Sequence, residues 1–106
     1  MSDRLDELQE WYASQCNGDW EHSCGVTILT SDNPAWNVTV DLAGTDMDGA
    51  VMAEVSHDNG HGEWMRCNIT DNQFGGVGDP SKLGAILDQF FALASAHGWR
   101  RRGPAD

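Results

Sequence analysis

Long apolar runs, paired cysteines and basic residues are all scarce in this sequence, and each scarcity excludes a class of protein. No window approaches the roughly 18 uninterrupted apolar residues that a membrane-spanning helix requires. The first ten residues, MSDRLDELQE, are charged from the third position and contain no apolar run, so we expect no secretory signal. The three cysteines form no CxxC pair, and an odd number suits a reducing compartment. We therefore expect a cytoplasmic protein.

Acidic residues dominate the charge: seventeen Asp and Glu face six Lys and Arg, a formal net charge of −11. Residues 100–106 hold three of the arginines and one aspartate, so residues 1–99 keep sixteen acidic against three basic residues, or −13. Such a surface repels nucleic acid and anionic membranes, whereas it attracts a basic protein and accelerates its association. Solubility alone is the other explanation. We predict one domain over residues 1–99 and a disordered Arg-rich tail over 100–106.

Catalytic motifs are also missing. The glycines at 75, 76 and 78 lack the lysine and the spacing of a phosphate-binding loop, and no serine lies in a Gly-x-Ser-x-Gly turn. One cluster, Asp19-Trp20-Glu21-His22, combines two carboxylates with an imidazole and could act as a general acid and base or as metal ligands. Adjacent residues of an extended segment point in opposite directions. This favours a hydrogen-bonded turn over the convergence of Asp19, Glu21 and His22 on one substrate atom.

Two metal sites are conceivable, and both lack the usual pattern. Asp46-Met47-Asp48-Gly49 resembles the start of a calcium loop, but its glycine comes fourth rather than sixth. A zinc site could combine residues far apart in the chain, namely Cys16, His22 and Cys24 with Cys67 or His61. None of the usual short ligand pairs is present there, and buried reduced cysteines are the commoner outcome. We predict neither a metal nor a cofactor.

Apolar periodicity predicts an α+β domain. Helical spacing marks residues 3–16 and 80–97; in the first helix the apolar face is Leu5, Leu8, Trp11, Tyr12 and Cys16, and the opposite face is Asp6, Glu7 and Glu10. Alternation of apolar and polar residues marks four strands, at residues 24–30, 36–42, 50–57 and 63–70. Asp79 is placed to cap the second helix, and Ser2 or Asp3 the first. We predict a four-stranded antiparallel β-meander, with the N-terminal and C-terminal helices packed on one face and a flexible passage at residues 74–78.

Three of the five tryptophans, Trp11, Trp20 and Trp36, fall within residues 11–45. A Trp ring buries on the order of 200 Å². We therefore expect these rings to fix the first helix, the turn after it and the first hairpin against one another.

Trp64 is different in kind. The alternation of residues 63–70 directs Met65, Cys67 and Ile69 inward, and Trp64, Arg66 and Asn68 outward onto a sheet face that the helices leave open. An exposed aromatic ring in a neighbourhood of Asp41, Glu54 and Arg66 has the composition of a protein-binding hot spot. A covering loop, a second copy of the chain or the opposite register of this strand would instead bury the ring.

The block WYASQCNGDWEHSCGVTILTSDNPAWNVTVDLAGT at residues 11–45 resembles the signature region of the immunity protein 53 family of bacterial polymorphic toxin systems. The W-x-x-C pattern at Trp64–Cys67, the run Asp71-Asn72-Gln73-Phe74, the glycine-rich passage and the final helix also resemble that family. The similarity covers nearly the whole chain apart from the arginine tail. It implies a small cytoplasmic antidote that binds a cognate toxin domain and blocks it without catalysis.

The acidic body suits a basic toxin, such as a nuclease. The resemblance does not identify the contact residues; from the residues themselves we predict first Trp64, Asp41 and Glu54 of the open sheet face, and next Asp46 and Asp48 of the loop. Two alternatives stay open: a small metal-dependent hydrolase that uses Asp19, Glu21 and His22, and a structural module that dimerises through its open sheet. We expect a monomer or a weak homodimer.

Overall fold

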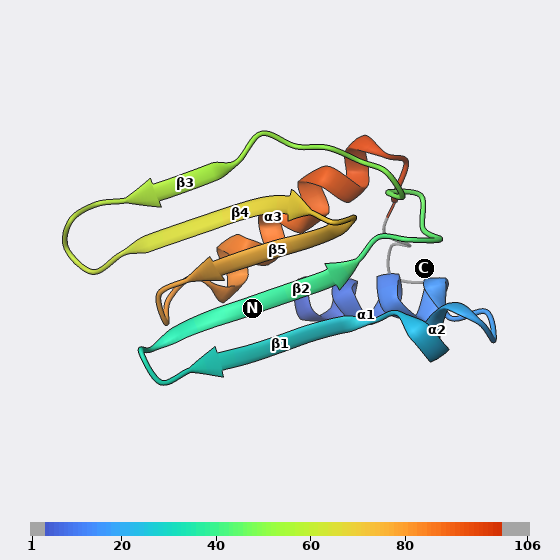
Figure 1. The fold of residues 1–106 in the computed structure, drawn as a ribbon, viewed down its shortest axis with the longest axis horizontal. Coiled ribbons are helices and arrows are strands. Elements are labelled where there is room, and N and C mark those ends of the chain that lie inside the picture. The colour runs from blue at the N-terminus through green and yellow to red at the C-terminus, as the bar shows by residue number, and fades with distance from the viewer. Residues whose placement is uncertain (1–3, 101–106) are drawn as a thin grey trace, which may run out of the picture.

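The computed structural model describes residues 4–100, which form a five-stranded antiparallel sheet and three helices (Figure 1). The helices are α1 (Arg4–Gln15), α2 (Trp20–Ser23) and α3 (Leu83–Ala96). The strands are β1 (Val26–Ser31), β2 (Ala35–Asp41), β3 (Val55–Asp58), β4 (Trp64–Thr70) and β5 (Gln73–Gly78). The strand order is β1-β2-β5-β4-β3, so β1 and β3 form the two edges. The predicted cap at Ser2 or Asp3 and the predicted tail from residue 101 onward lie outside the described residues.

The main departure from the predicted fold is the fifth strand. Residues 74–78, predicted to be flexible, form with Gln73 the strand β5 in the middle of the sheet, between β2 and β4. The four-stranded meander is therefore wrong, because β2 pairs with β5 while β3 lies at the far edge beside β4. Asp71 and Asn72, with φ of 53° and 60°, connect β4 to β5. Two consecutive positive φ values are typical of a type I′ turn, whose twist matches that of paired strands.

Glycine is required in β5 because α3 lies directly against it. A Cβ atom on Gly76 would lie 2.3 Å from Cγ2 of Ile86, and one on Gly78 would lie 2.7 Å from Cβ of Lys82. A larger residue at either position would push α3 away from the sheet. Gly75 faces the other way, where an added Cβ would meet only Oδ1 of Asn68, at 3.5 Å. The glycines of this strand therefore reflect close packing rather than flexibility.

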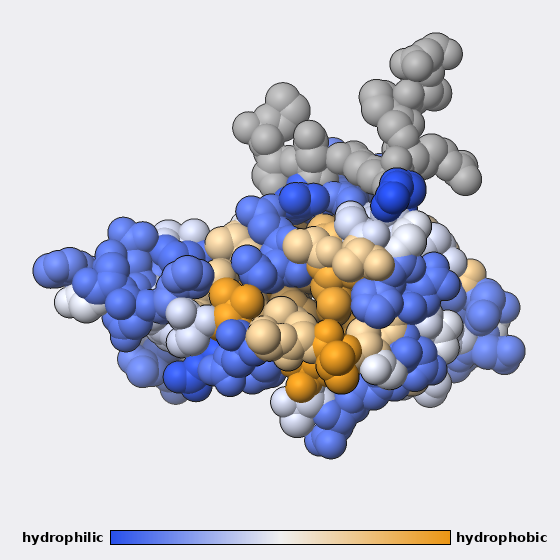
Figure 2. All heavy atoms as spheres, turned by 90° about the horizontal axis from the view of Figure 1, so that it is seen from above, coloured by the Kyte–Doolittle hydropathy of each residue, from blue (hydrophilic) through white to orange (hydrophobic). Residues whose placement is uncertain are grey.

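β3 is shorter than the predicted third strand. The alternation at residues 50–57 predicted Val51, Ala53 and Val55 inward, but only Val55–Asp58 pairs with β4, and Val51 is 85% exposed. Met47, from the loop before this segment, is buried in the core instead. Figure 2 looks onto this side of the molecule and shows an apolar area surrounded by hydrophilic residues.

The two long helices lie on the same face of the sheet, as predicted, and the core lies between them and the strands (Figure 1). Trp11 meets Trp20 and Phe90 edge to face, with ring centroids 5.9 and 5.0 Å apart, so α1, α2 and α3 share one aromatic cluster. Trp36 does not join this cluster among the described residues; its indole N–H donates to the carbonyl of Pro80. None of the helices between residues 4 and 100 has the length and apolar character to cross a membrane.

The buried side of α1 differs from the predicted stripe. Leu8 and Trp11 are buried as expected, but Leu5 and Tyr12 are 51% and 41% exposed. Glu7, predicted on the exposed acidic face, is buried, and its carboxylate accepts hydrogen bonds from Nη1 of Arg4 (2.6 Å) and Nε1 of Trp99 (2.9 Å). Because α1 packs against α3 as well as the sheet, its buried side faces α3. Leu5 and Tyr12 therefore lie at the edge of the buried side, where solvent reaches them.

Candidate partner-binding surface

The helices α1 and α3 leave the opposite face of the sheet uncovered (Figure 1). The residues that strand alternation places on this face are mostly polar. The outward direction of Trp64, Arg66 and Asn68 is confirmed, because Met65 and Cys67 between them are buried. We call this surface the open face; strand register assigns to it Thr27, Leu29, Asn37, Thr39, Asp41, Ser56, Asp58, Trp64, Arg66, Asn68, Thr70, Gln73, Gly75 and Val77. The contribution of β5 was missing from the prediction because that strand was missed.

Trp64 is half-buried at the start of β4. Asp41 was predicted to lie near this ring, and that prediction is wrong. Asp41 is opposite Gln73, which is in turn opposite Thr70 at the far end of β4. The length of β4 therefore separates the two residues by about 20 Å. Glu54 lies between these ends, and its carboxylate pairs with Nε of Arg66 at 3.3 Å. Both of these side chains are more than half exposed, so the ion pair contributes little stability.

Asp79 fixes the backbone of Trp64 instead of capping α3, which begins four residues later at Leu83. Its buried carboxylate accepts hydrogen bonds from the Ser81 hydroxyl (2.6 Å), the Ser81 amide (2.8 Å) and the Trp64 amide (2.7 Å). These donors, led by the Ser81 hydroxyl, hold the pKa of the Asp79 carboxyl well below its usual value. Trp64 thus projects from a firmly held position.

Asp41 connects three strands. Its half-buried carboxylate accepts hydrogen bonds from the amide of Gly25, just before β1, and from the side chain of Gln73 at the start of β5. Asp41 is therefore part of the fold as well as of the charge on the open face.

Asp48 and Asp46 lie in the loop of residues 42–50 and have different surroundings. The Asp48 carboxylate accepts hydrogen bonds from the Gly44 amide and the Asn72 side chain, both at 2.9 Å, and these bonds lower the pKa of Asp48. Asp48 thus ties this loop to the β4–β5 turn. Asp46 is exposed, and its carboxylate has no hydrogen bond or ion pair within the described part of the chain.

The cluster Asp19-Trp20-Glu21-His22 is helical rather than extended, because Trp20–Ser23 forms α2. Glu21 accepts hydrogen bonds from the amides of Asn17 (2.9 Å) and Gly18 (2.8 Å). The bond from its own amide, followed by these two, lowers the pKa of Glu21. This carboxylate therefore holds a turn, as the hydrogen-bonded alternative predicted. Trp20 is buried, and its indole N–H donates to the carbonyl of Ala43, so α2 lies against the 42–50 loop.

These contacts bring several carboxylates to one end of the sheet. We call this region the acidic end, and it comprises Asp19, Glu21, Asp41, Asp46, Asp48 and Asp71. Three basic residues of the described part of the chain form ion pairs away from this end: Arg4 with Glu7 and Asp88, Arg66 with Glu54, and Lys82 with Glu63 and Asp79. Arg100 donates to the carbonyls of Ser95 and Trp99. Of the predicted contacts, Asp41, Asp46 and Asp48 therefore belong together, whereas Trp64 and Glu54 lie apart from them.

The residues considered for zinc are dispersed. Cys67 is fully buried on the helix-facing side of β4, and burial raises the pKa of its thiol to about 11. Cys16 is exposed at the end of α1, and Cys24 is half-buried before β1. Within residues 4–100, no group of three or more His, Cys, Asp or Glu side chains is arranged to hold a metal ion.

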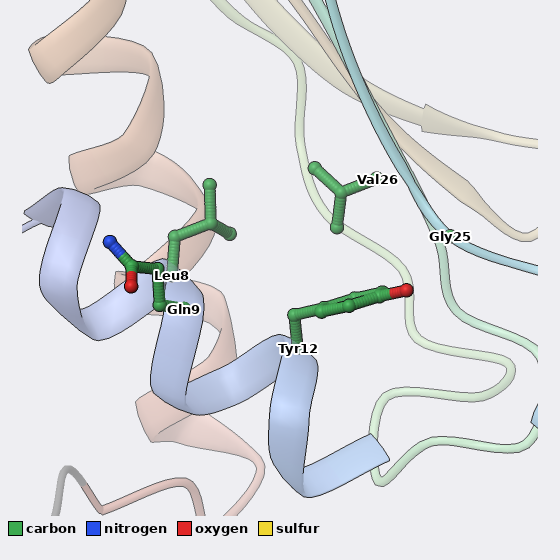
Figure 3. A pocket seen from close by; sticks show the side chains of 5 residues that line it. All are labelled: Leu8, Gln9, Tyr12, Gly25 and Val26. Carbon is green, nitrogen blue, oxygen red and sulfur yellow. The ribbon is translucent and has the colours of Figure 1, made fainter. Parts of the chain in front are cut away.

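A cleft of about 310 Å³ between α1 and β1 was not predicted (Figure 3). Its lining residues are Leu8, Gln9 and Tyr12 of α1, together with Gly25 and Val26. In Figure 3 the ring of Tyr12 extends from α1 towards β1, below the side chain of Val26. No pattern in the sequence indicated this cleft, because Tyr12 was predicted on the buried side of the first helix and the cleft depends on how α1 packs beside the sheet.

Comparison with known proteins identifies a family. No curated protein and no solved structure matches the chain. A family model described as Immunity protein 53 matches residues 5–95, which is most of the chain and includes the whole sheet and nearly all of α1 and α3. The resemblance seen in the sequence is thereby confirmed, and the chain belongs to the Immunity protein 53 family.

Proposed function

We propose that this protein binds a cognate bacterial toxin domain in the cytoplasm and neutralises it by obstruction, without catalysis of its own. Membership of the Immunity protein 53 family carries this proposal. The turn-holding hydrogen bonds of Glu21 agree with it, because they occupy the carboxylate that the alternative hydrolase would need.

The charge distribution supports a basic partner, and a nuclease is one such toxin. The acidic end presents Asp19, Asp46, Asp48 and Asp71 as exposed carboxylates, and the whole chain carries a net charge of −11. A negative surface raises the association rate of a cationic protein and is screened by salt. The same charge opposes pairing of two copies, so we propose that the free protein is a monomer.

We propose contacts on the open face and the acidic end. Trp64 supplies the aromatic anchor, since large rings on firmly held backbone contribute most to the residence time of a complex. Glu54 and Asp46 are exposed and supply charge at little structural cost. Asp41 and Asp48 also supply charge, but their hydrogen bonds make them part of the fold.

An interface of ordinary size reaches all of these residues. Such an interface buries about 800 Å² on each partner, equivalent to a disc roughly 30 Å across. The sheet is about 20 Å long, and its five strands span about 19 Å. One toxin domain can therefore cover the open face from Trp64 to the acidic end.

The test is a binding and inhibition experiment with the toxin domain encoded by the neighbouring gene. We expect a stable complex at nanomolar to micromolar concentrations, loss of the toxin's activity within it, and survival of cells that express both proteins. Absence of a complex at micromolar concentrations, together with unprotected cells, would refute the proposed function.

A further inference from the structure

The two edges of the sheet differ in their unpaired backbone groups, and β1 offers the longer row. The amide of Asp41 donates to the carbonyl of Gly25, so these two residues are a hydrogen-bonded pair of the β1–β2 ladder. Such pairs alternate along an antiparallel ladder. The N–H and C=O groups of Val26, Ile28 and Thr30 therefore point away from β2, towards the outer edge.

Nothing in the sequence of β1 protects this edge. Exposed edges usually carry charged residues, proline or a bulge, which prevent pairing with another chain. The strand VTILTS contains no charged residue and no proline, and its six residues pair with β2 without interruption. β3 is protected in the usual way, because it is four residues long and contains His57 and Asp58.

The apolar cleft lies directly beside this open edge. Val26 lines the cleft and is also one of the residues whose backbone groups point outward. Directly opposed residues of neighbouring strands place their side chains on the same face of a sheet. A strand added beside β1 would therefore direct the side chain opposite Val26 towards Leu8 and Tyr12 (Figure 3).

The charge around the cleft selects the kind of segment that fits. Glu21 lies close to Tyr12, and its negative charge is one of the causes, after Cys16, that raise the pKa of Tyr12. The Asp41 carboxylate lies at Gly25, at the start of β1, and Asp32 is exposed just beyond its end. A second copy of this chain would bring a further net charge of −11 to the same place. A cationic segment is attracted instead.

We infer that β1 is the docking edge for the toxin: an extended basic segment of the toxin adds beside it as a sixth strand and inserts an apolar side chain into the cleft. Main-chain hydrogen bonds to Val26, Ile28 and Thr30 supply affinity, and the cleft selects the inserted side chain. This inference rests on the proposed function and specifies how the toxin is bound.

Charge variants test the cleft with the toxin domain encoded by the neighbouring gene as the probe. Gln9 is exposed at the rim of the cleft, so Gln9→Lys adds a positive charge there without touching the core. Ala92→Lys adds the same charge at an exposed position of α3 and is the matched control. We expect Gln9→Lys to weaken toxin binding by about tenfold or more and Ala92→Lys by less than about threefold.

Truncation and hydrogen exchange test the same edge independently. Tyr12→Ala removes a partly exposed ring of the cleft, and we expect about tenfold weaker binding. In the complex, the amides of Val26, Ile28 and Thr30 should exchange more slowly than in the free protein, whereas the outward amides of β3 should not change.

The possible failures are distinguishable. If the unmodified protein does not bind the toxin domain, the proposed function fails, and this inference fails with it. If it binds, but Gln9→Lys and Tyr12→Ala bind equally well and the β1 amides stay unprotected, only the docking edge is refuted. A concentration-dependent dimer of the free protein that Gln9→Lys abolishes would also overturn the inference, because the occupant of the edge would then be a second copy.

Discussion

The two edge strands of the sheet, β1 and β3, differ in how far their unpaired backbone groups are protected from pairing with another chain. β3 is short, carries His57 and Asp58, and follows an irregular segment with the exposed Val51. β1 is longer, uncharged and flanked by an apolar cleft. The β3 side has an apolar surface without a long open edge, whereas the β1 side has both. Hydrophobic exposure alone therefore does not identify a docking edge, because unpaired backbone groups must also be available beside it.

We expect the largest loss of stability from a substitution in β5, at the centre of the sheet between the two edges. Replacing Gly76 by Val should lower the free energy of unfolding by about 3 kcal/mol, because the new Cβ would meet Ile86 at 2.3 Å and displace α3. Gly75→Val is the matched control, since a Cβ there would make only an ordinary contact with Asn68, at 3.5 Å, and its effect should stay within about 0.5 kcal/mol. Urea denaturation measures both. Equal losses would contradict the close packing of α3 on β5.

Trp64 tests the part of the open face nearest β3. We expect Trp64→Ala to weaken toxin binding by about 2 kcal/mol or more while the fold stays intact. Calorimetric titration gives the affinity, and thermal unfolding of the free variant gives the control. If the variant unfolds, Trp64 serves the core; if it binds like the unmodified protein, the toxin engages the β1 side alone.

Proline at two neighbouring positions tests the direction of the backbone groups in β1. Leu29→Pro removes a donor from the β1–β2 ladder and should cost about 2 kcal/mol of stability, because a carbonyl of β2 loses its partner. Thr30→Pro removes an outward N–H and should cost less than about 0.5 kcal/mol. Thermal unfolding distinguishes the two variants. A reversed ranking would mean that Val26, Ile28 and Thr30 do not face the open edge.

Asp79 makes the β3 side sensitive to acid. Its pKa is lowered in the folded protein, so its stabilising contribution is complete above the unfolded pKa of about 3.9 and is lost as the pH falls below that value. Asp79→Asn should therefore lower the melting temperature at pH 7 and flatten its fall below pH 4. Scanning calorimetry from pH 7 to pH 2.5 measures this. If the melting temperature of the variant falls below pH 4 as steeply as that of the unmodified protein, other carboxylates cause the loss of stability in acid.

The smallest expected effect concerns long-range attraction at the acidic end. Asp46→Asn should slow toxin association by about twofold at low ionic strength and leave dissociation unchanged, because Asp46 is exposed and supports no other group. Stopped-flow measurements in high salt are the control, since screening should abolish the difference. A change in the dissociation rate would place Asp46 inside the interface.

Periodicity was sufficient for most of the fold. Both long helices, β1, β2 and β4 were located from the spacing of apolar residues, and the inward direction of Cys67 was correct. β5 was missed because glycine has no side chain to show alternation, and the Asp71-Asn72 turn before it is a weaker hairpin signal than one with glycine. The cleft could not be predicted, because it depends on the direction from which α1 meets the sheet.

The hydrogen bond from the Trp99 indole to the Glu7 carboxylate joins the C-terminal end of the described chain to the first helix. Helix α3 ends at Ala96, so the residues directly after it look like a natural position for a truncation or a fusion to another protein. A junction placed before Trp99 would remove the indole donor from the carboxylate of Glu7, a residue that is only 6% exposed, and would leave the hydrogen bond from Arg4. The folding unit therefore extends past its last helix, and a fusion that spares it must begin after Trp99.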